Sequence, residues 1–157
     1  MKMPALIFAV AIALAGCGSA TDAVTFKAPP NYTASVSVGP FMQLWRGPQD
    51  NALMLMALPT KTDLKNLSAE SNVKDAQVLE ASSTHICGNQ PAYYFSVVGE
   101  HEEPGSGSSG STQEKRQIDM IATYAGSKTY LAMYIRPVGS PADPAAEAAI
   151  HNICPRT

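Results

Sequence analysis

The segment KTYLAMYIR at positions 128–136 carries the pattern on which the fold prediction depends. Leu131, Met133 and Ile135 occupy one set of alternate positions, and the other set holds two tyrosines and an alanine. Successive side chains of a strand point to opposite faces of its sheet, so a period of two residues is typical of a strand with a covered face. The segment therefore predicts one strand of a sheet that is packed on at least one side.

Seven stretches upstream of this segment also have the composition of strands. They are rich in β-branched, aromatic or alternating apolar residues and lie at residues 24–28, 32–38, 41–45, 52–58, 77–86, 92–100 and 113–124. Turn-forming residues at 46–51 predict a hairpin, and the turns at 87–91 and 125–127 separate later strands. Residues 100–116 are dense in Gly and Ser and predict a mobile hairpin tip, because they offer no apolar surface to offset the entropy of ordering.

A short helix is predicted in the middle of the chain. Thr62 is a candidate N-cap residue, and Leu64 and Leu67 then share the inward face.

A second helix is predicted near the C-terminus. Asp143 is a suitable N-cap, Pro144 suits the first helical position, and Pro155 stops the helix. One apolar stripe contains Ala146, Ala149, Ile150, Ile153 and Cys154. We therefore expect Cys154 to point from this helix toward the sheet. Together the elements predict a single α+β domain over residues 24–157, in which an antiparallel sheet carries the short middle helix and a packed C-terminal helix.

The first residues have the order of a secretory signal. Lys2 supplies a positive charge, and the following stretch from residue 5 to residue 16 is apolar for only 12 residues. Because spanning a bilayer core of about 30 Å takes roughly 20 residues, a permanent transmembrane helix is disfavoured.

The sequence LAGC at positions 14–17 ends this stretch and resembles the lipobox of bacterial lipoproteins. The resemblance implies that residues 1–16 form a cleaved signal peptide and that Cys17 carries a thioether-linked diacylglycerol. Residues 17–23 would then be a lipidated tether. Gly18 in place of Asp implies the outer membrane, facing the periplasm, if the cell has two membranes. The alternative is an ordinary secretory signal followed by an accidental cysteine.

The charge of the mature chain limits its partners. Losing Lys2 with the signal leaves ten basic residues against thirteen acidic ones, a formal charge of −3, with no basic cluster beyond Lys115 and Arg116. Nucleic-acid binding normally needs a clustered basic surface, so we expect none.

Cys87 and Cys154 form an even pair once Cys17 is committed to lipid. In an exported and oxidising compartment such a pair predicts a disulfide. Two buried free thiols, or half of a metal site, are the alternatives.

The order of the elements resembles the PsbP-like fold of small extrinsic and lipid-anchored proteins. The resemblance depends on FKAP at 26–29, CGNQPA at 87–92 and the helix ending in Cys154. These motifs concern packing, so the resemblance implies a fold and no catalytic residues.

Two groups of residues offer metal ligands. His101 lies among three glutamates at 100–103, but a Gly- and Ser-rich loop preorganises ligands poorly, so a solvated loop is the preferred interpretation. Five methionines are soft ligands for Cu(I), yet methionine more commonly fills gaps in cores. They are Met42, Met54, Met56, Met120 and Met133. We therefore expect no metal and no cofactor.

Catalytic motifs do not accompany the histidines His85, His101 and His151. Neither GxSxG nor HExxH occurs, so we predict that the protein is not an enzyme, with an enzyme lacking a recognisable motif as an alternative. Trp45 and the tyrosines at 93, 94, 124, 130 and 134 suit either a binding groove or the sheet core, and we prefer the core.

These observations predict a lipid-anchored, non-catalytic protein of the cell membrane that acts by binding another envelope protein. A small-ligand or metal carrier is the second hypothesis.

Overall fold

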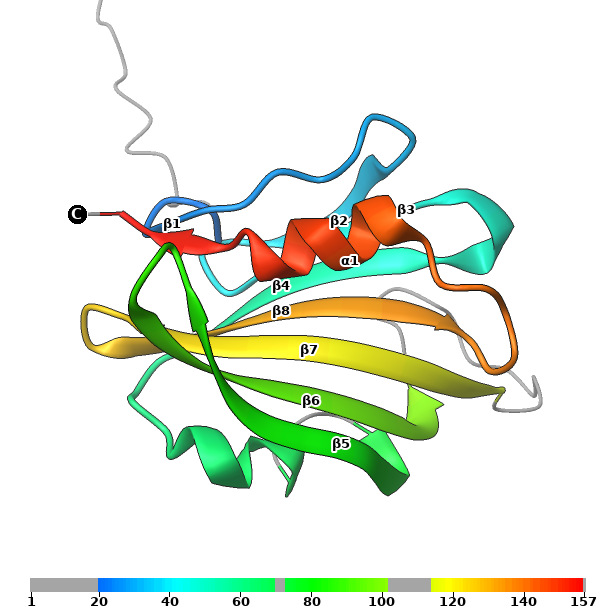
Figure 1. Cartoon of the computed structure of the whole chain (residues 1–157). Helices are drawn as coiled ribbons and strands as arrows, with labels where there is room; N and C mark the ends of the chain where they lie inside the picture. The colour runs from blue at the N-terminus through cyan, green and yellow to red at the C-terminus, as the bar shows by residue number, and fades with distance from the viewer. Residues whose placement is uncertain (1–19, 70–72, 102–113, 157) are drawn as a thin grey trace, which may run out of the picture.

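One antiparallel sheet of seven strands forms the body of the molecule in the computed structural model, which describes residues 20–69, 73–101 and 114–156 (Figure 1). The strand order is β2-β3-β4-β8-β7-β6-β5. The strands are β2 (Thr33–Val38), β3 (Met42–Arg46), β4 (Ala52–Leu58), β5 (Val73–Ile86), β6 (Gln90–His101), β7 (Lys115–Ala125) and β8 (Lys128–Pro137). Two short strands, β1 (Val24–Thr25) and β9 (Cys154–Pro155), form a separate pair.

The alternating segment at 128–136 lies in the central strand, β8, between β4 and β7. Its residues are buried from Thr129 to Ile135, so both faces of the sheet are covered here. The predicted hairpin around residues 46–51 is confirmed: β3 and β4 are paired, and the short 3-10 helix η1 (Pro48–Asp50) lies between them.

Two hydrophobic clusters cover the two faces of the sheet. The first lies beneath the helix α1 (Pro144–His151) and the N-terminal residues, where Ile150 and Ile153 pack against Leu53, Leu55 and other sheet side chains. The second lies on the opposite face and includes residues of β3, β4, β6, β7 and β8. Figure 1 shows α1 lying along one side of the sheet, where it contacts β8 and β7.

The predicted α+β class is wrong, because the fold is mainly β and contains a single eight-residue α-helix among the described residues. The middle segment forms a 3-10 helix, η2 (Leu64–Ala69). It connects β4 to β5, which are separated in the sheet by β8, β7 and β6. Residues three apart lie directly in line in a 3-10 helix, and this geometry lets Leu64 and Leu67 both face the second cluster.

The inward face of the middle segment was predicted correctly. Leu67 is fully buried in the second cluster and Leu64 packs against it. The side chain of Asp63, rather than Thr62, accepts the hydrogen bond from the backbone N–H of Lys65 at 3.1 Å.

The C-terminal helix begins as predicted and ends earlier. The side chain of Asp143 accepts the N–H of Ala145, and Pro144 occupies the first turn. The helix ends at His151, so the prediction that Cys154 lies on its apolar stripe is wrong. Cys154 lies in β9, because this segment pairs with β1 and the N–H of Arg156 donates to the carbonyl of Ala23 at 2.9 Å.

The predicted signal peptide (residues 1–16), Cys17 and the tip of the loop at 100–116 lie outside the described residues. The predicted tether at 17–23 enters the described region at Ala20, which is only 1% exposed and belongs to the first cluster. The chain therefore packs onto the domain from residue 20 onward.

Candidate binding groove

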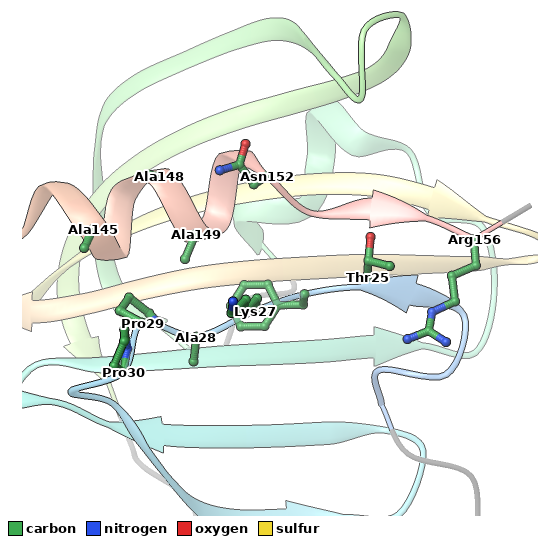
Figure 2. Close-up of a pocket in the computed structure, with 11 residues that line it drawn as sticks. Thr25, Lys27, Ala28, Pro29, Pro30, Ala145, Ala148, Ala149, Asn152 and Arg156 are labelled. Carbon is green, nitrogen blue, oxygen red and sulfur yellow. The ribbon is translucent and has the colours of Figure 1, made fainter.

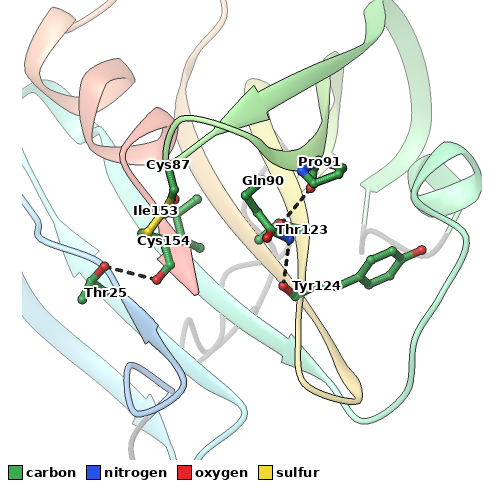
Figure 3. The surroundings of a disulfide bond; sticks show 8 residues. All are labelled: Thr25, Cys87, Gln90, Pro91, Thr123, Tyr124, Ile153 and Cys154. Atoms are coloured by element: carbon green, nitrogen blue, oxygen red, sulfur yellow. Dashed lines mark hydrogen bonds between the residues drawn. A yellow bond between two sulfur atoms is a disulfide. The ribbon is translucent and has the colours of Figure 1, made fainter. Parts of the chain in front are cut away.

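A disulfide joins Cys87 to Cys154, with their Cα atoms 5.6 Å apart, as the sequence predicted. It links the turn between β5 and β6 to β9 (Figure 3). The hydroxyl of Thr25 in β1 donates to the carbonyl of Cys154 at 3.1 Å, as Figure 3 also shows. The disulfide therefore holds β9, and through it β1, against the end of the sheet.

An open groove of about 720 Å³ lies between the segment that follows β1 and one side of α1 (Figure 2). Its helical wall contains Ala145, Ala148, Ala149 and Asn152, which recur at the spacing of one helix face. Its other wall contains Thr25, Phe26, Lys27, Ala28, Pro29 and Pro30, and Arg156 lies at one end. Because the three alanines are small, the helix leaves a hollow at this face.

Both ends of the N-terminal wall are fastened. The pairing of β1 with β9 holds the first end. At the other end the Tyr32 hydroxyl donates to Asp143 Oδ2 at 2.9 Å. Burial, followed by the nearby Asp143 carboxylate, raises the pKa of Tyr32 well above its usual range. The Phe26 ring also packs against Trp45, with ring centroids 5.0 Å apart. The groove is thus a preformed feature of the fold.

Between its two fastened ends, the N-terminal wall of the groove includes backbone groups that form no hydrogen bond. Among the described residues, no hydrogen bond uses the backbone N–H or carbonyl of Phe26, Lys27 or Ala28. The side chains of Lys27 and Arg156 are exposed, and no acidic residue lines the groove in the described part of the chain. The groove therefore combines an apolar hollow, unpaired backbone groups and two cations.

A smaller and more polar pocket, about 340 Å³, lies between α1 and strands β5, β6 and β7. The buried Asp119 carboxylate lines it and accepts a hydrogen bond from Ser96 at 2.6 Å, while Arg136 lies 3.8 Å away. Tyr94 also borders the pocket, and burial, followed by the Asp119 charge, raises its pKa to about 12.

His151 lies beside the same pocket and stacks on Tyr94, with ring centroids 5.7 Å apart. Its Nδ1 lies 2.9 Å from the carbonyl oxygen of Glu147. No hydrogen bond among the described residues joins His151 to Ser82 or Ser83, which also line the pocket. The imidazole is thus oriented by its own helix.

The other histidines lie away from both pockets. His85 is exposed in β5, opposite Pro91. His101 is the last residue of β6, and its glutamate neighbours at 102 and 103 lie outside the described residues. Within the described ranges, no group of three or more His, Cys, Asp or Glu residues is placed to hold a metal ion.

The five methionines all lie in or against the second hydrophobic cluster, which confirms their interpretation as packing residues. Tyr130 and Tyr134 are buried in the first cluster, as the core interpretation requires. Phe26, which was assigned to a strand rather than to a site, is the one aromatic residue among the described residues that line the groove.

Sequence reasoning missed the groove. Residues 24–28 were predicted as one strand, whereas β1 ends at Thr25. The adjacent Pro29 and Pro30 were the available signal, because proline cannot donate to a strand ladder. Two consecutive prolines therefore indicate that the strand pairing of the preceding segment can stop several residues before them.

The fold defines a mainly β protein built on one seven-stranded antiparallel sheet with a terminal helix. No family model matches the chain, and no curated protein matches it. A crystal structure at 1.50 Å from Bacteroides thetaiotaomicron VPI-5482 is similar, with a TM-score of 0.53 and 15% sequence identity. The match covers 85% of this chain and 45% of that one, so the chain spans less than half of its length. At this identity the likeness concerns the fold alone.

No helix within the described ranges is both long and apolar enough to span a membrane.

Proposed function

We propose that this protein is a lipid-anchored, non-catalytic binding protein of the cell envelope, and that its groove binds an extended segment of another envelope protein. The observation that carries the proposal is the unpaired backbone of Phe26, Lys27 and Ala28 along the apolar groove. An extended peptide binds such an edge by adding a strand, where main-chain hydrogen bonds give affinity and side-chain pockets give specificity.

The attachment to the membrane is supported by the first seventeen residues. A charged residue, a short apolar run and LAGC at 14–17 occur in the order that lipoproteins use. Cys17 would carry two or more acyl chains, which hold a protein stably at a membrane. The protein would then lie at the outer membrane, facing the periplasm, in a cell with two membranes.

The dimensions of the groove suit a short peptide. The eight residues of α1 extend about 12 Å at 1.5 Å per residue, a length that about four extended residues match. Small apolar side chains at alternate positions would face Ala145, Ala148 and Ala149. Carboxylates of the partner would meet Lys27 and Arg156, whose charges are exposed at the groove.

Selection of displayed random peptides against the purified mature protein tests this proposal. We expect the selected peptides to alternate apolar and acidic residues, and to lose at least tenfold in affinity when Ala148→Glu fills the groove. Ala81→Glu, at an exposed position of β5, is the matched control and should leave binding unchanged. Peptides that bind the wild type and the Ala148→Glu variant equally would contradict the proposed site.

A small-ligand carrier is the second candidate, supported by the polar pocket around buried Asp119. A cationic amine would be its favoured ligand, because a carboxylate lines the pocket. A rise in melting temperature with a small amine, absent in an Asp119→Asn variant, would favour it.

A further inference from the structure

The N-terminal wall of the groove and the helix α1 run in opposite directions. Tyr32, which follows the wall, donates to Asp143 immediately before α1, so the end of the wall lies beside the start of the helix. Thr25, at the beginning of the wall, pairs with Cys154, which follows the helix. The groove therefore has two distinct ends, which we call the β9 end, at Thr25, and the helix-start end, at Asp143.

The two ends of the groove differ in charge. Arg156 directly follows β9 and lines the groove at the β9 end. The helix-start end is lined by Pro29, Pro30 and Ala145, as Figure 2 shows. The carboxylate of Asp143 lies beside this second end, where it caps α1 and accepts from the wall. A ligand that crosses the groove thus has a cation at one end and a carboxylate at the other.

The guanidinium of Arg156 is available to a ligand. The residue is exposed, and no hydrogen bond or ion pair among the described residues involves its side chain. Asp22 is the acidic residue that precedes the Ala23–Arg156 contact, and it does not line the groove. The C-terminus of α1 contributes about half a negative charge at this end, which the full charge of Arg156 outweighs. A carboxylate is the partner that a guanidinium binds most strongly, through two parallel hydrogen bonds.

The strand β9 blocks the groove at the same end. The groove lies between the wall and α1, and β9 follows α1, so β9 lies in line with the groove. Cys154 and Pro155 occupy the ladder position beside β1, and the disulfide to Cys87 holds them there. The unpaired backbone of the wall begins only at Phe26. A peptide strand added to the wall can therefore continue no farther than β9, and must end or leave the groove there.

The direction of the wall sets the direction of the added strand. Antiparallel pairing is slightly more stable per residue than parallel pairing, and an antiparallel peptide would run from the helix-start end to the β9 end. Its C-terminus would then stop at β9. Arg156 lies two residues beyond Cys154, about 7 Å at roughly 3.3 Å per residue, and its long side chain extends back to line the groove. A reversed peptide would instead bring its carboxylate toward Asp143.

We infer that the groove recognises the free C-terminus of its partner protein, with about the last four residues paired along Phe26, Lys27 and Ala28 and the terminal carboxylate bound to Arg156. This inference rests on the proposed function and names the part of the partner that the groove binds. An internal segment of a protein does not fit in the same way, because its chain would have to continue through the position of β9.

Selection from two random heptapeptide libraries against the purified mature protein tests the inference. One library displays its peptides with a free C-terminal carboxylate, and in the other the C-terminus is fused to the display protein. We expect only the first library to yield binders that lose about tenfold in affinity with Ala148→Glu. If neither library yields such binders, the proposed groove itself is overturned. If both yield them equally, the groove stands and the C-terminal recognition is overturned.

A selected peptide is then synthesised in three forms, and titration calorimetry measures the affinity of each. The forms are the free acid, the C-terminal amide, and an amide that carries a succinyl group at its N-terminus. The succinyl form keeps one negative charge and moves it to the opposite end. We expect both amides to bind about tenfold more weakly than the acid, because hydrogen bonds to a charged group are the strong ones. Equal binding of the acid and the succinyl form would show a general attraction of charge and would overturn the inference.

The variant Arg156→Gln tests the assigned side chain, and Lys27→Gln is its matched control. Each removes one exposed cation from the groove, but Lys27 lies along the wall and Arg156 at the β9 end. Arg156→Gln should bring the affinities of acid and amide within about twofold of each other, whereas Lys27→Gln should leave their ratio unchanged. The backbone N–H that donates to Ala23 remains in Arg156→Gln, so its melting temperature should match the wild type. A preference for the acid that survives Arg156→Gln would overturn the role of this arginine.

Discussion

The hydroxyl oxygen of Tyr134 accepts the backbone N–H of Asp143 at 2.9 Å and thereby fixes the start of α1 to the central strand. Asn51 Nδ2 donates to the same hydroxyl oxygen at 3.2 Å. The Asp143 side chain in turn accepts from Ala145 and from the Tyr32 hydroxyl. The sheet, α1 and the N-terminal wall of the groove therefore meet at Asp143, and the shape of the groove depends on this residue.

Replacing Asp143 with Ala should lower the stability of the protein and make the shape of the groove less well fixed. Loss of an N-cap costs about 0.5–2 kcal/mol, and Tyr32 also loses its acceptor. We expect the melting temperature to fall by roughly 3–6 °C in a domain of this size. Asp143→Asn keeps an acceptor and serves as the control. Thermal unfolding followed by circular dichroism would contradict this role if both variants melted like the wild type.

Removing the disulfide should destabilise the protein strongly. The sequence separation of 67 residues corresponds to about 4 kcal/mol in the chain-entropy model. The Cys87→Ser and Cys154→Ser variants should each unfold at lower urea concentration, and the double variant should be no worse than either. A midpoint within error of the wild type under oxidising conditions would show that the bridge contributes nothing to stability.

Alkaline pH should destabilise the fold through its buried tyrosines. Tyr94 keeps its proton in the native state up to about pH 12, whereas an unfolded tyrosine loses its proton near pH 10. Its contribution is therefore fully present below about pH 10 and is lost as the pH rises through the folded pKa. The pKa values of Tyr32, Tyr130 and Tyr134 are also raised, so they act in the same direction.

Urea unfolding at a series of pH values measures this effect. We expect the free energy of unfolding to decline from about pH 10 upward and the decline to be shallower in Tyr94→Phe. Tyr94→Phe retains the ring that stacks on His151, so packing is largely preserved. A steeper decline in the Phe variant would contradict the assigned burial.

Replacing Cys17 with Ser should abolish lipidation, because serine cannot form the thioether. The precursor should then accumulate unprocessed. Labelling with a radioactive fatty acid measures the outcome, and the Cys87→Ser variant is the control because it keeps the proposed lipid site. Label retained on the Cys17→Ser protein would exclude this position.

The strands were predictable because their signals are local. The alternation around Leu131 and the turn at residues 46–51 involve neighbours along the chain, and β4 matches the predicted range of 52–58. The start of α1 was equally local, since Asp143 caps a helix that begins at the next residue. Such patterns depend on side-chain spacing and need no distant partner.

The position of Cys154 was not predictable in the same way. Its spacing fits the stripe of Ile150, yet the strand pairing of β1 with β9 ends the helix at His151. The type of helix in the middle segment shows the same limit, because it depends on how Leu64 and Leu67 pack against the folded sheet. Intrinsic helix propensity predicts the extent of a helix only weakly when tertiary contacts such as these compete with it.

By itself the sequence determined the approximate positions of the seven strands of the main sheet, the capped start of α1 and the pairing of Cys87 with Cys154, because each follows from nearby residues or from the count of cysteines. Only the tertiary structure decided the mainly β class, the burial of Ala20 and the groove. The groove exists because Tyr32 reaches Asp143, 111 residues away, and Thr25 reaches Cys154, 129 residues away. No periodicity along the chain encodes contacts over such separations, since they arise from how the whole sheet packs.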